Sequence, residues 1–156
     1  MKERKFRNDL IWLDEEFDGQ ELFFQVMANR LYQKGMVTQK FGDALSKREK
    51  EYPTGLKTEH YEIAIPHTDV EYVKKTFIAF IRLKRPIRFS HMGIPGMMVN
   101  AKFAFVLGLT EPQNQVEALS TLVKLISDQE QMAMLEEMQS KADICSQLNL
   151  FFEENM

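Results

Sequence analysis

The sequence has 156 residues, of which 44% are hydrophobic, and this content is enough to fill the core of one compact domain. We therefore predict a single domain over residues 1–156. The formal charge of −3 is spread in groups of mixed sign, which argues against nucleic acid or an anionic membrane surface as the partner. No run of about eighteen apolar residues occurs and the start has no apolar signal core, so we expect a cytoplasmic protein with no direct membrane insertion.

The cysteine and histidine content gives little support for a disulfide or a metal site. The single Cys145 cannot form an internal disulfide, and because it lies in the helical pattern of residues 144–148 we expect it to be a small buried hydrophobe. His60, His67 and His91 form neither an i, i+4 helical pair nor a cluster with cysteine. We predict that the protein binds no metal.

The first predicted elements are a strand and a long helix. Residues 10–13 are apolar between charged neighbours, which favours a first strand. Asp18 followed by Glu21 has the spacing of a capping box, and Gly35 is typical of a helix end. The apolar residues that recur between them at helical spacing are Leu22, Phe23, Val26, Met27, Leu31 and Tyr32.

A second helix is predicted after Thr38, which we expect to be its N-cap. Charged residues 47–51 lie near the end of this helix, and residues 53–55, Pro-Thr-Gly, form a turn. Its apolar face consists of Phe41, Ala44 and Leu45.

The stretch 62–71 carries the chemistry that we consider most informative. Residues 62–65 alternate polar and apolar side chains as a half-buried strand does, and Pro66, which cannot extend a central ladder, places His67 at the strand end. Thr68 and Glu71 have capping-box spacing, so we predict a helical turn whose free amides would favour an anion. His67 is then either a site for a phosphoryl group or a surface histidine at an ordinary strand end.

Two buried strands are predicted in the middle of the chain. Residues 77–83 are almost continuously apolar, which indicates burial on both faces, and residues 86–89 form a short extended piece. A loop is expected at residues 93–96, which contain two glycines and a proline, and another buried strand follows at residues 101–109.

The rest of the chain has helical periodicity. Pro112 favours the first turn of a long helix, a Met-rich helix follows it, and residues 142–152 form a last apolar element that should pack on the core. Helices before, between and after the strands predict an α/β fold, a single layered domain in which helices flank a small mixed β-sheet on both faces. The apolar stripe predicted for the long helix is Val116, Leu119, Leu122, Val123 and Ile126.

Several of these segments together resemble a known family. They are Arg48-Glu49, the turn at residues 53–55, the Ile-Pro-His signature within residues 63–67, and residues 73–75 running into a buried strand. In this context the sequence resembles the enzyme IIA domain of the sugar phosphotransferase system, in its fructose/mannitol class, and looks most like the galactitol-type members. The resemblance covers residues 8–150.

The resemblance implies a central mixed sheet flanked by helices and a phosphotransferase that works through a phosphohistidine. His67 would accept a phosphoryl group from phospho-HPr and pass it to a cysteine of an enzyme IIB during sugar uptake. The family needs no metal and no organic cofactor. The choice of sugar would belong to the membrane component of the transporter.

The resemblance also implies a set of phosphate-stabilising residues. Arg48 matches the family's arginine, and Thr54 either offers a hydroxyl to the phosphate or satisfies the loop backbone. Many relatives carry a second histidine where this sequence has Gln115, which can donate an N–H but carries no positive charge. His91 would either substitute for that histidine or be a plain loop residue.

Two other roles remain open at this level. One is a regulatory protein of the nitrogen-regulatory enzyme IIA type, whose phosphorylation state controls the binding of a partner. The other is a degenerate domain that folds but no longer transfers phosphate, which the presence of Gln115 suggests.

Overall fold

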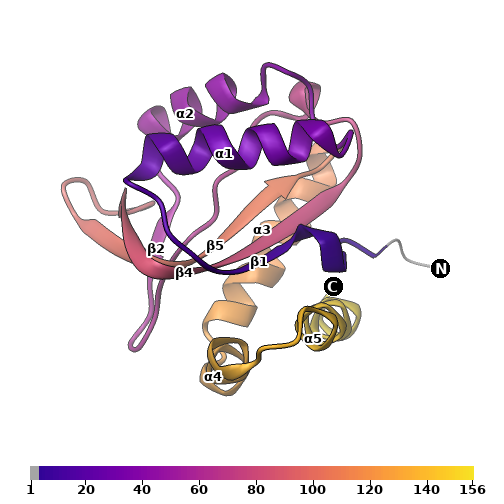
Figure 1. The fold of residues 1–156 in the computed structure, drawn as a ribbon. Coiled ribbons are helices and arrows are strands. Elements are labelled where there is room, and N and C mark those ends of the chain that lie inside the picture. Colours follow the sequence, from indigo (N-terminus) through magenta and orange to yellow (C-terminus); the bar gives the residue numbers. More distant parts are fainter. Residues whose placement is uncertain (1–3) are drawn as a thin grey trace.

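The computed structural model describes residues 4–156, and at its centre is a mixed five-stranded sheet in the order β1-β4-β5-β3-β2 (Figure 1). β1 is parallel to β4, β4 is antiparallel to β5, β5 is parallel to β3, and β3 is antiparallel to β2. The strands are β1 (Ile11–Glu15), β2 (Gly55–Lys57), β3 (Glu62–Ala64), β4 (Phe77–Ser90) and β5 (Met98–Gly108).

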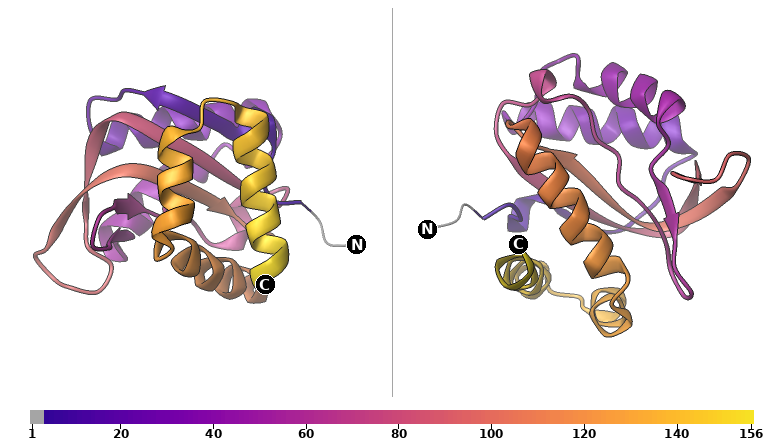
Figure 2. Two further views of the ribbon diagram at one scale, coloured as in Figure 1. Left: turned by 90° about the horizontal axis from the view of Figure 1, so that it is seen from below. Right: turned by 180° about the vertical axis from the view of Figure 1, so that it is seen from behind.

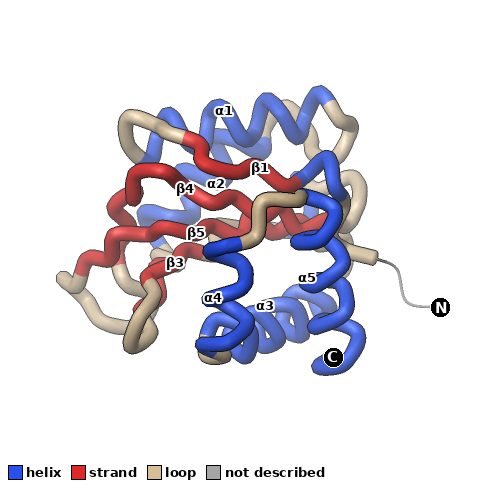
Figure 3. Tube along the Cα trace, turned by 60° about the horizontal axis from the view of Figure 1, so that its bottom comes forward, coloured by secondary structure: helices blue, strands red, loops and turns tan. Residues whose placement is uncertain are grey.

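Helices cover both faces of this sheet, as the sequence predicts. The first two helices lie on one face, and the last three lie on the other (Figures 1 and 3). None of the helices in residues 4–156 has the length and apolar character needed to cross a bilayer. The helices are α1 (Gln20–Gln33), α2 (Phe41–Glu51), α3 (Pro112–Ile126), α4 (Gln129–Glu137) and α5 (Lys141–Asn155).

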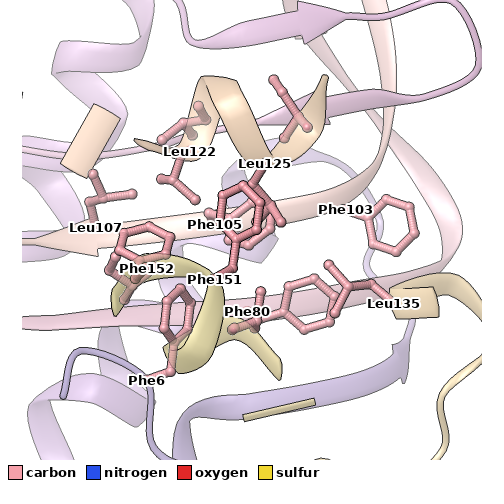
Figure 4. Packing of buried hydrophobic residues seen from close by; sticks show 14 of the residues in the cluster. Phe6, Phe80, Phe103, Phe105, Leu107, Leu122, Leu125, Leu135, Phe151 and Phe152 are labelled. Atoms are coloured by element: carbon pink, nitrogen blue, oxygen red, sulfur yellow. The ribbon is translucent and has the colours of Figure 1, made fainter. Parts of the chain in front are cut away.

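The alternation of side chains along the central strands explains the two cores. In β5, Phe103 and Phe105 point into the core beneath α3, α4 and α5, whereas Ala104 and Val106 point into the core beneath α1 and α2. All four are fully buried. Figure 4 shows the first of these cores, in which aromatic rings of the sheet pack against leucines of α3 and phenylalanines of α5. The prediction of strands buried on both faces is confirmed. Cys145 is buried in this core, also as predicted.

The strands β4 and β5 form one long hairpin whose far end projects from the body of the domain (Figure 2). The predicted short piece at residues 86–89 is not separate, because β4 continues to Ser90 across a register shift between Arg82 and Ile87. The hairpin tip folds back onto β2, where a Cβ on Gly55 would lie 2.6 Å from the carbonyl oxygen of Ser90. Gly55 therefore permits a close approach between the two backbones.

Three predicted helix caps are wrong. α1 begins after Gly19, and Asp18 forms an ion pair with Arg85 at 2.9 Å. α2 begins after Lys40, so Thr38 lies outside it, and the hydroxyl of Thr38 has no hydrogen-bond partner among the described residues. In each case the capping spacing is present, but tertiary packing sets the start of the helix.

The third wrong cap concerns the turn after His67. Thr68 donates its hydroxyl to the carbonyl oxygen of Asp69 at 2.9 Å, and only a 3-10 turn, Val70–Tyr72, follows. A turn of three residues has neither the length nor the aligned amides of an anion-binding helix start. Any stabilisation of a phosphoryl group must therefore come from other residues.

The apolar stripe predicted for α3 is only partly correct. Val116 is 70% exposed and Val123 is 45% exposed, so both face away from the core. The residues of α3 buried in this core are Ala118, Leu122, Leu125 and Ile126, and the partly buried Leu119 packs against it as predicted.

Candidate functional site

His67 lies beside the carboxyl end of the central strand β5. The chain leaves β3 at Ala64 and continues along β5, so that His67 pairs with Leu107 and the Leu107 N–H donates to the carbonyl oxygen of Pro66 at 3.0 Å. Pro66 lacks an N–H, but its carbonyl still extends the pairing. The histidine is only 7% exposed, so it is a buried residue at an isolated bridge to β5 rather than a surface one.

The hydrogen bond at Nδ1 fixes the tautomer of the ring. Nδ1 of His67 lies 2.8 Å from the carbonyl oxygen of Ile65, and because a carbonyl oxygen can only accept, Nδ1 carries the proton. Burial lowers the pKa of His67, and the charge of Arg48 lowers it further, against opposing effects of the Ile65 carbonyl and Asp69. The ring is therefore neutral near pH 7, and Nε2 has a free lone pair. Nε2 makes no hydrogen bond within residues 4–156.

Arg48 provides a positive charge next to this ring. Nη1 of Arg48 contacts Oδ1 of Asp69 at 3.0 Å, and the guanidinium stacks over the ring of Tyr52 at 5.3 Å. Its Nε is buried and has no partner in residues 4–156. The side chain of Arg48 is 29% exposed and its Nη1 is held by the exposed Asp69, so an incoming anion can reach the guanidinium by replacing that carboxylate.

A pocket of ≈ 210 Å³ opens at this guanidinium. It lies between α2, which contributes one lysine, one arginine and one glutamate, and the segment that follows His67, which contributes a threonine and an aspartate. The residues that line it are Ala44, Lys47, Arg48, Glu51, Tyr52, Thr68, Asp69 and Tyr72.

Thr54 is held by a buried carboxylate. Its N–H donates to Oε2 of Glu49 at 2.7 Å, and its hydroxyl donates to Oε1 of the same residue at 2.8 Å. Thr54 is 2% exposed and Glu49 is 5% exposed. In this structure the Thr54 hydroxyl is donated to the side chain of Glu49. The resemblance noted in the sequence includes Glu49 but implies no role for it.

Gln115 and His91 are not joined to His67 by any polar contact in residues 4–156. Gln115 lies in the first turn of α3, just after the end of β5 that His67 adjoins, and its side chain makes no hydrogen bond there. His91 lies at the turn of the β4–β5 hairpin, at the opposite end of β5, and its Nδ1 accepts the N–H groups of Gly93 and Ile94. His91 is therefore a plain loop histidine.

Within residues 4–156, no group of three or more histidine, cysteine, aspartate or glutamate side chains is arranged to hold a metal ion.

Burial of Glu49 makes the stability of the fold depend on pH. Burial raises the pKa of Glu49 from 4.5 to about 7, despite the opposing bonds from Thr54 and the charge of Arg48. The folded state then holds a proton that the unfolded state releases, so the free energy of unfolding falls as pH rises from about 4.5 to about 7. We expect a loss of up to about 3 kcal/mol from this residue.

Urea unfolding of the wild type and of Glu49→Gln across that pH range measures this effect. The glutamine variant lacks the titrating group, so its unfolding free energy should fall less steeply. Parallel pH profiles for the two proteins would contradict the assignment of the titration to Glu49.

Comparison with known proteins identifies the family of this chain. Residues 4–150 match the family model described as "Phosphoenolpyruvate-dependent sugar phosphotransferase system, EIIA 2". The chain is 30% identical over 96 residues to the PTS system galactitol-specific EIIA component of Escherichia coli strain K12; the match covers 62% of this chain and 63% of that protein.

Two solved structures share the fold. The IIA mannitol structure from Escherichia coli superposes with a TM-score of 0.73 at 22% identity, over 92% of this chain and 99% of that one. The complex of the mannitol enzyme IIA with phosphorylated enzyme IIB, also from Escherichia coli, superposes with a TM-score of 0.70 at 21% identity, over 96% and 99%. The predicted layered α/β fold and the resemblance noted in the sequence are confirmed, and the chain belongs to the EIIA 2 family of the phosphoenolpyruvate-dependent sugar phosphotransferase system.

Proposed function

We propose that this protein is an enzyme IIA phosphocarrier that accepts a phosphoryl group on Nε2 of His67 from phospho-HPr and passes it to an enzyme IIB during sugar uptake. The observation that carries the proposal is the 2.8 Å hydrogen bond from Nδ1 of His67 to the Ile65 carbonyl oxygen. It leaves the lone pair of a neutral imidazole on the other nitrogen, which is the form that attacks phosphorus.

In the first step the Nε2 lone pair forms a bond to phosphorus while the bond between phosphorus and the imidazole of HPr breaks. The HPr imidazole leaves with the electron pair, so charge and atoms balance. Nδ1 keeps its proton throughout, and the ring becomes positively charged when phosphorylated. The Ile65 carbonyl accepts a hydrogen bond from that ring and stabilises its charge.

Arg48 stabilises the charge on the transferred group. Phosphoryl transfer depends mainly on alignment and on donors to the equatorial oxygens. Nη1 of Arg48 becomes such a donor when the phosphoryl oxygens replace the exposed carboxylate of Asp69 as its partner. The Thr54 hydroxyl is donated to Glu49, and Gln115 offers a neutral amide from the first turn of α3.

In the second step a cysteine thiolate of the enzyme IIB attacks phosphorus, and His67 leaves as a neutral imidazole. The likeness to a galactitol-specific EIIA component supports an enzyme IIB of the galactitol type. The likeness to an enzyme IIA solved in complex with phosphorylated enzyme IIB supports this kind of partner.

Phosphorylation with purified components tests the proposal. Incubation with enzyme I, HPr and labelled phosphoenolpyruvate should add one acid-labile phosphoryl group per chain, and omission of HPr should prevent it. Addition of a galactitol-type enzyme IIB should then remove the label from this protein. No labelling would contradict the proposal, and label that stays after several enzymes IIB are added would favour the regulatory type.

A further inference from the structure

We propose that Glu49 is a positioning residue for the phosphoryl transfer, which holds the backbone around His67 in place relative to Arg48 through a series of hydrogen bonds. The proposal rests on the proposed function for its kinetic consequence, but its structural part concerns the unphosphorylated protein alone. Glu49 touches none of the reacting atoms.

The first link is between Glu49 and Thr54. Both oxygens of the carboxylate accept from one residue, Oε2 from the Thr54 N–H at 2.7 Å and Oε1 from the Thr54 hydroxyl at 2.8 Å. Two contacts to one residue fix both the position and the orientation of the loop that follows α2. Because Glu49 and Thr54 are almost fully buried, water cannot replace either bond.

The second link runs from Thr54 to the strand that carries His67. The Thr54 carbonyl oxygen accepts the N–H of Ile65 at 3.2 Å, and the next residue, Gly55, pairs with Ala64 in the β2–β3 ladder. The Ile65 carbonyl oxygen in turn accepts Nδ1–H of His67 at 2.8 Å. Thr54 thus holds Ile65, and the carbonyl oxygen of Ile65 sets the tautomer of His67.

The positions of both Arg48 and His67 therefore depend on Glu49. Arg48 precedes Glu49 on the last turn of α2, and its charge lowers the pKa of His67. The Glu49–Thr54 contact fastens that turn to the His67 strand. A displacement of about 1 Å between reacting groups costs on the order of 10²-fold in rate, so a side chain that fixes this spacing affects catalysis from outside the site.

Position and charge can be separated at Glu49. In Glu49→Gln the amide oxygen can accept the Thr54 N–H, and the amide nitrogen can donate to the Thr54 hydroxyl oxygen, so both contacts persist without the charge. In Glu49→Met the side chain keeps its length but loses both contacts. Thr54→Val removes one contact alone, and Glu59→Gln makes the same chemical change at an exposed loop residue.

Two measurements on these four variants test the proposal. The first is the His67 tautomer and its Nδ1–H signal in the unphosphorylated proteins, from long-range ¹H–¹⁵N NMR correlations. The second is the rate of phosphorylation against the concentration of phospho-HPr, which separates the maximal rate from the half-saturating concentration.

We expect Glu49→Met to lower the maximal rate about 10²-fold with an unchanged half-saturating concentration, and to broaden or lose the Nδ1–H signal. Thr54→Val should give a smaller change of the same kind, which keeps the test decisive if Glu49→Met does not fold. Glu49→Gln and Glu59→Gln should both resemble the wild type.

A Thr54→Val variant with wild-type tautomer and kinetics would overturn the proposal. So would a Glu49→Gln variant as impaired as Glu49→Met, because the charge rather than the position would then matter. If the wild type itself accepts no phosphoryl group, the proposed function fails, but the NMR comparison still decides whether Glu49 positions His67.

Discussion

Replacement of His67 with alanine is expected to abolish phosphorylation by phospho-HPr. The substitution removes the nucleophilic nitrogen, and loss of a nucleophile costs on the order of 10⁶-fold in other enzymes, which leaves no measurable label here. The alanine also leaves the Ile65 carbonyl without its donor, so we expect a loss of about 1–3 kcal/mol in the free energy of unfolding. Transfer of label from phosphoenolpyruvate and urea unfolding measure the two effects.

The other two histidines provide matched controls. His60 is exposed in the loop before β3, and His91 hydrogen-bonds within the β4–β5 turn. His60→Ala and His91→Ala should each take up label at the wild-type rate. Persistent acid-labile label in His67→Ala, or its loss in His91→Ala, would place the phosphoryl group elsewhere.

Replacement of Arg48 with alanine is expected to slow phosphorylation about 10²- to 10³-fold while the fold is retained. This is the usual cost of one donor to a developing negative charge. The fold is retained because Arg48 belongs to neither hydrophobic core and its contacts are with the exposed residues Asp69 and Tyr52. Arg48→Lys should recover part of the rate, since an ammonium keeps the charge but lacks the planar pair of donors.

The same variant has a second consequence that does not depend on phosphoryl transfer. The positive charge of Arg48 lowers the pKa of His67, so its removal should raise that pKa. An NMR titration of the His67 ring measures the direction, and Lys50→Ala, an exposed cation on the same helix, is the control. An unchanged rate together with an unchanged pKa would show that Arg48 does not act on His67.

Much of the fold follows from local patterns. The period of 3.6 predicts α1 and α3, and the continuous apolar runs of β4 and β5 predict strands covered on both faces. The predicted caps are wrong because Asp18 and Thr68 bind other partners in the folded protein. The spacing of residues in the sequence cannot predict those contacts. The predicted burial of Val116 is wrong for a related reason. The apolar stripe of a helix is predicted without knowledge of where the neighbouring elements pack.

The site, too, can be predicted from the sequence only in part. The Ile-Pro-His signature identifies His67, and the resemblance adds Arg48. Key contacts that position these two side chains, however, are with residues far away in the sequence. The pairing of His67 with Leu107 joins strands far apart in the sequence, and the Arg48–Asp69 contact spans 21 positions. The buried Glu49–Thr54 contact is local, and a glutamate five residues before a threonine in a turn is the signal that could have found it.

The direct test of the central claim is the identity of the phosphorylated nitrogen. Protein labelled with ¹⁵N-histidine and phosphorylated by phospho-HPr shows in NMR spectra which ring nitrogen is bonded to phosphorus. Because Nδ1 donates to the Ile65 carbonyl, we expect phosphorus on Nε2 of His67 and a retained Nδ1–H signal. Phosphorus on Nδ1, or on a residue other than His67, would contradict the account.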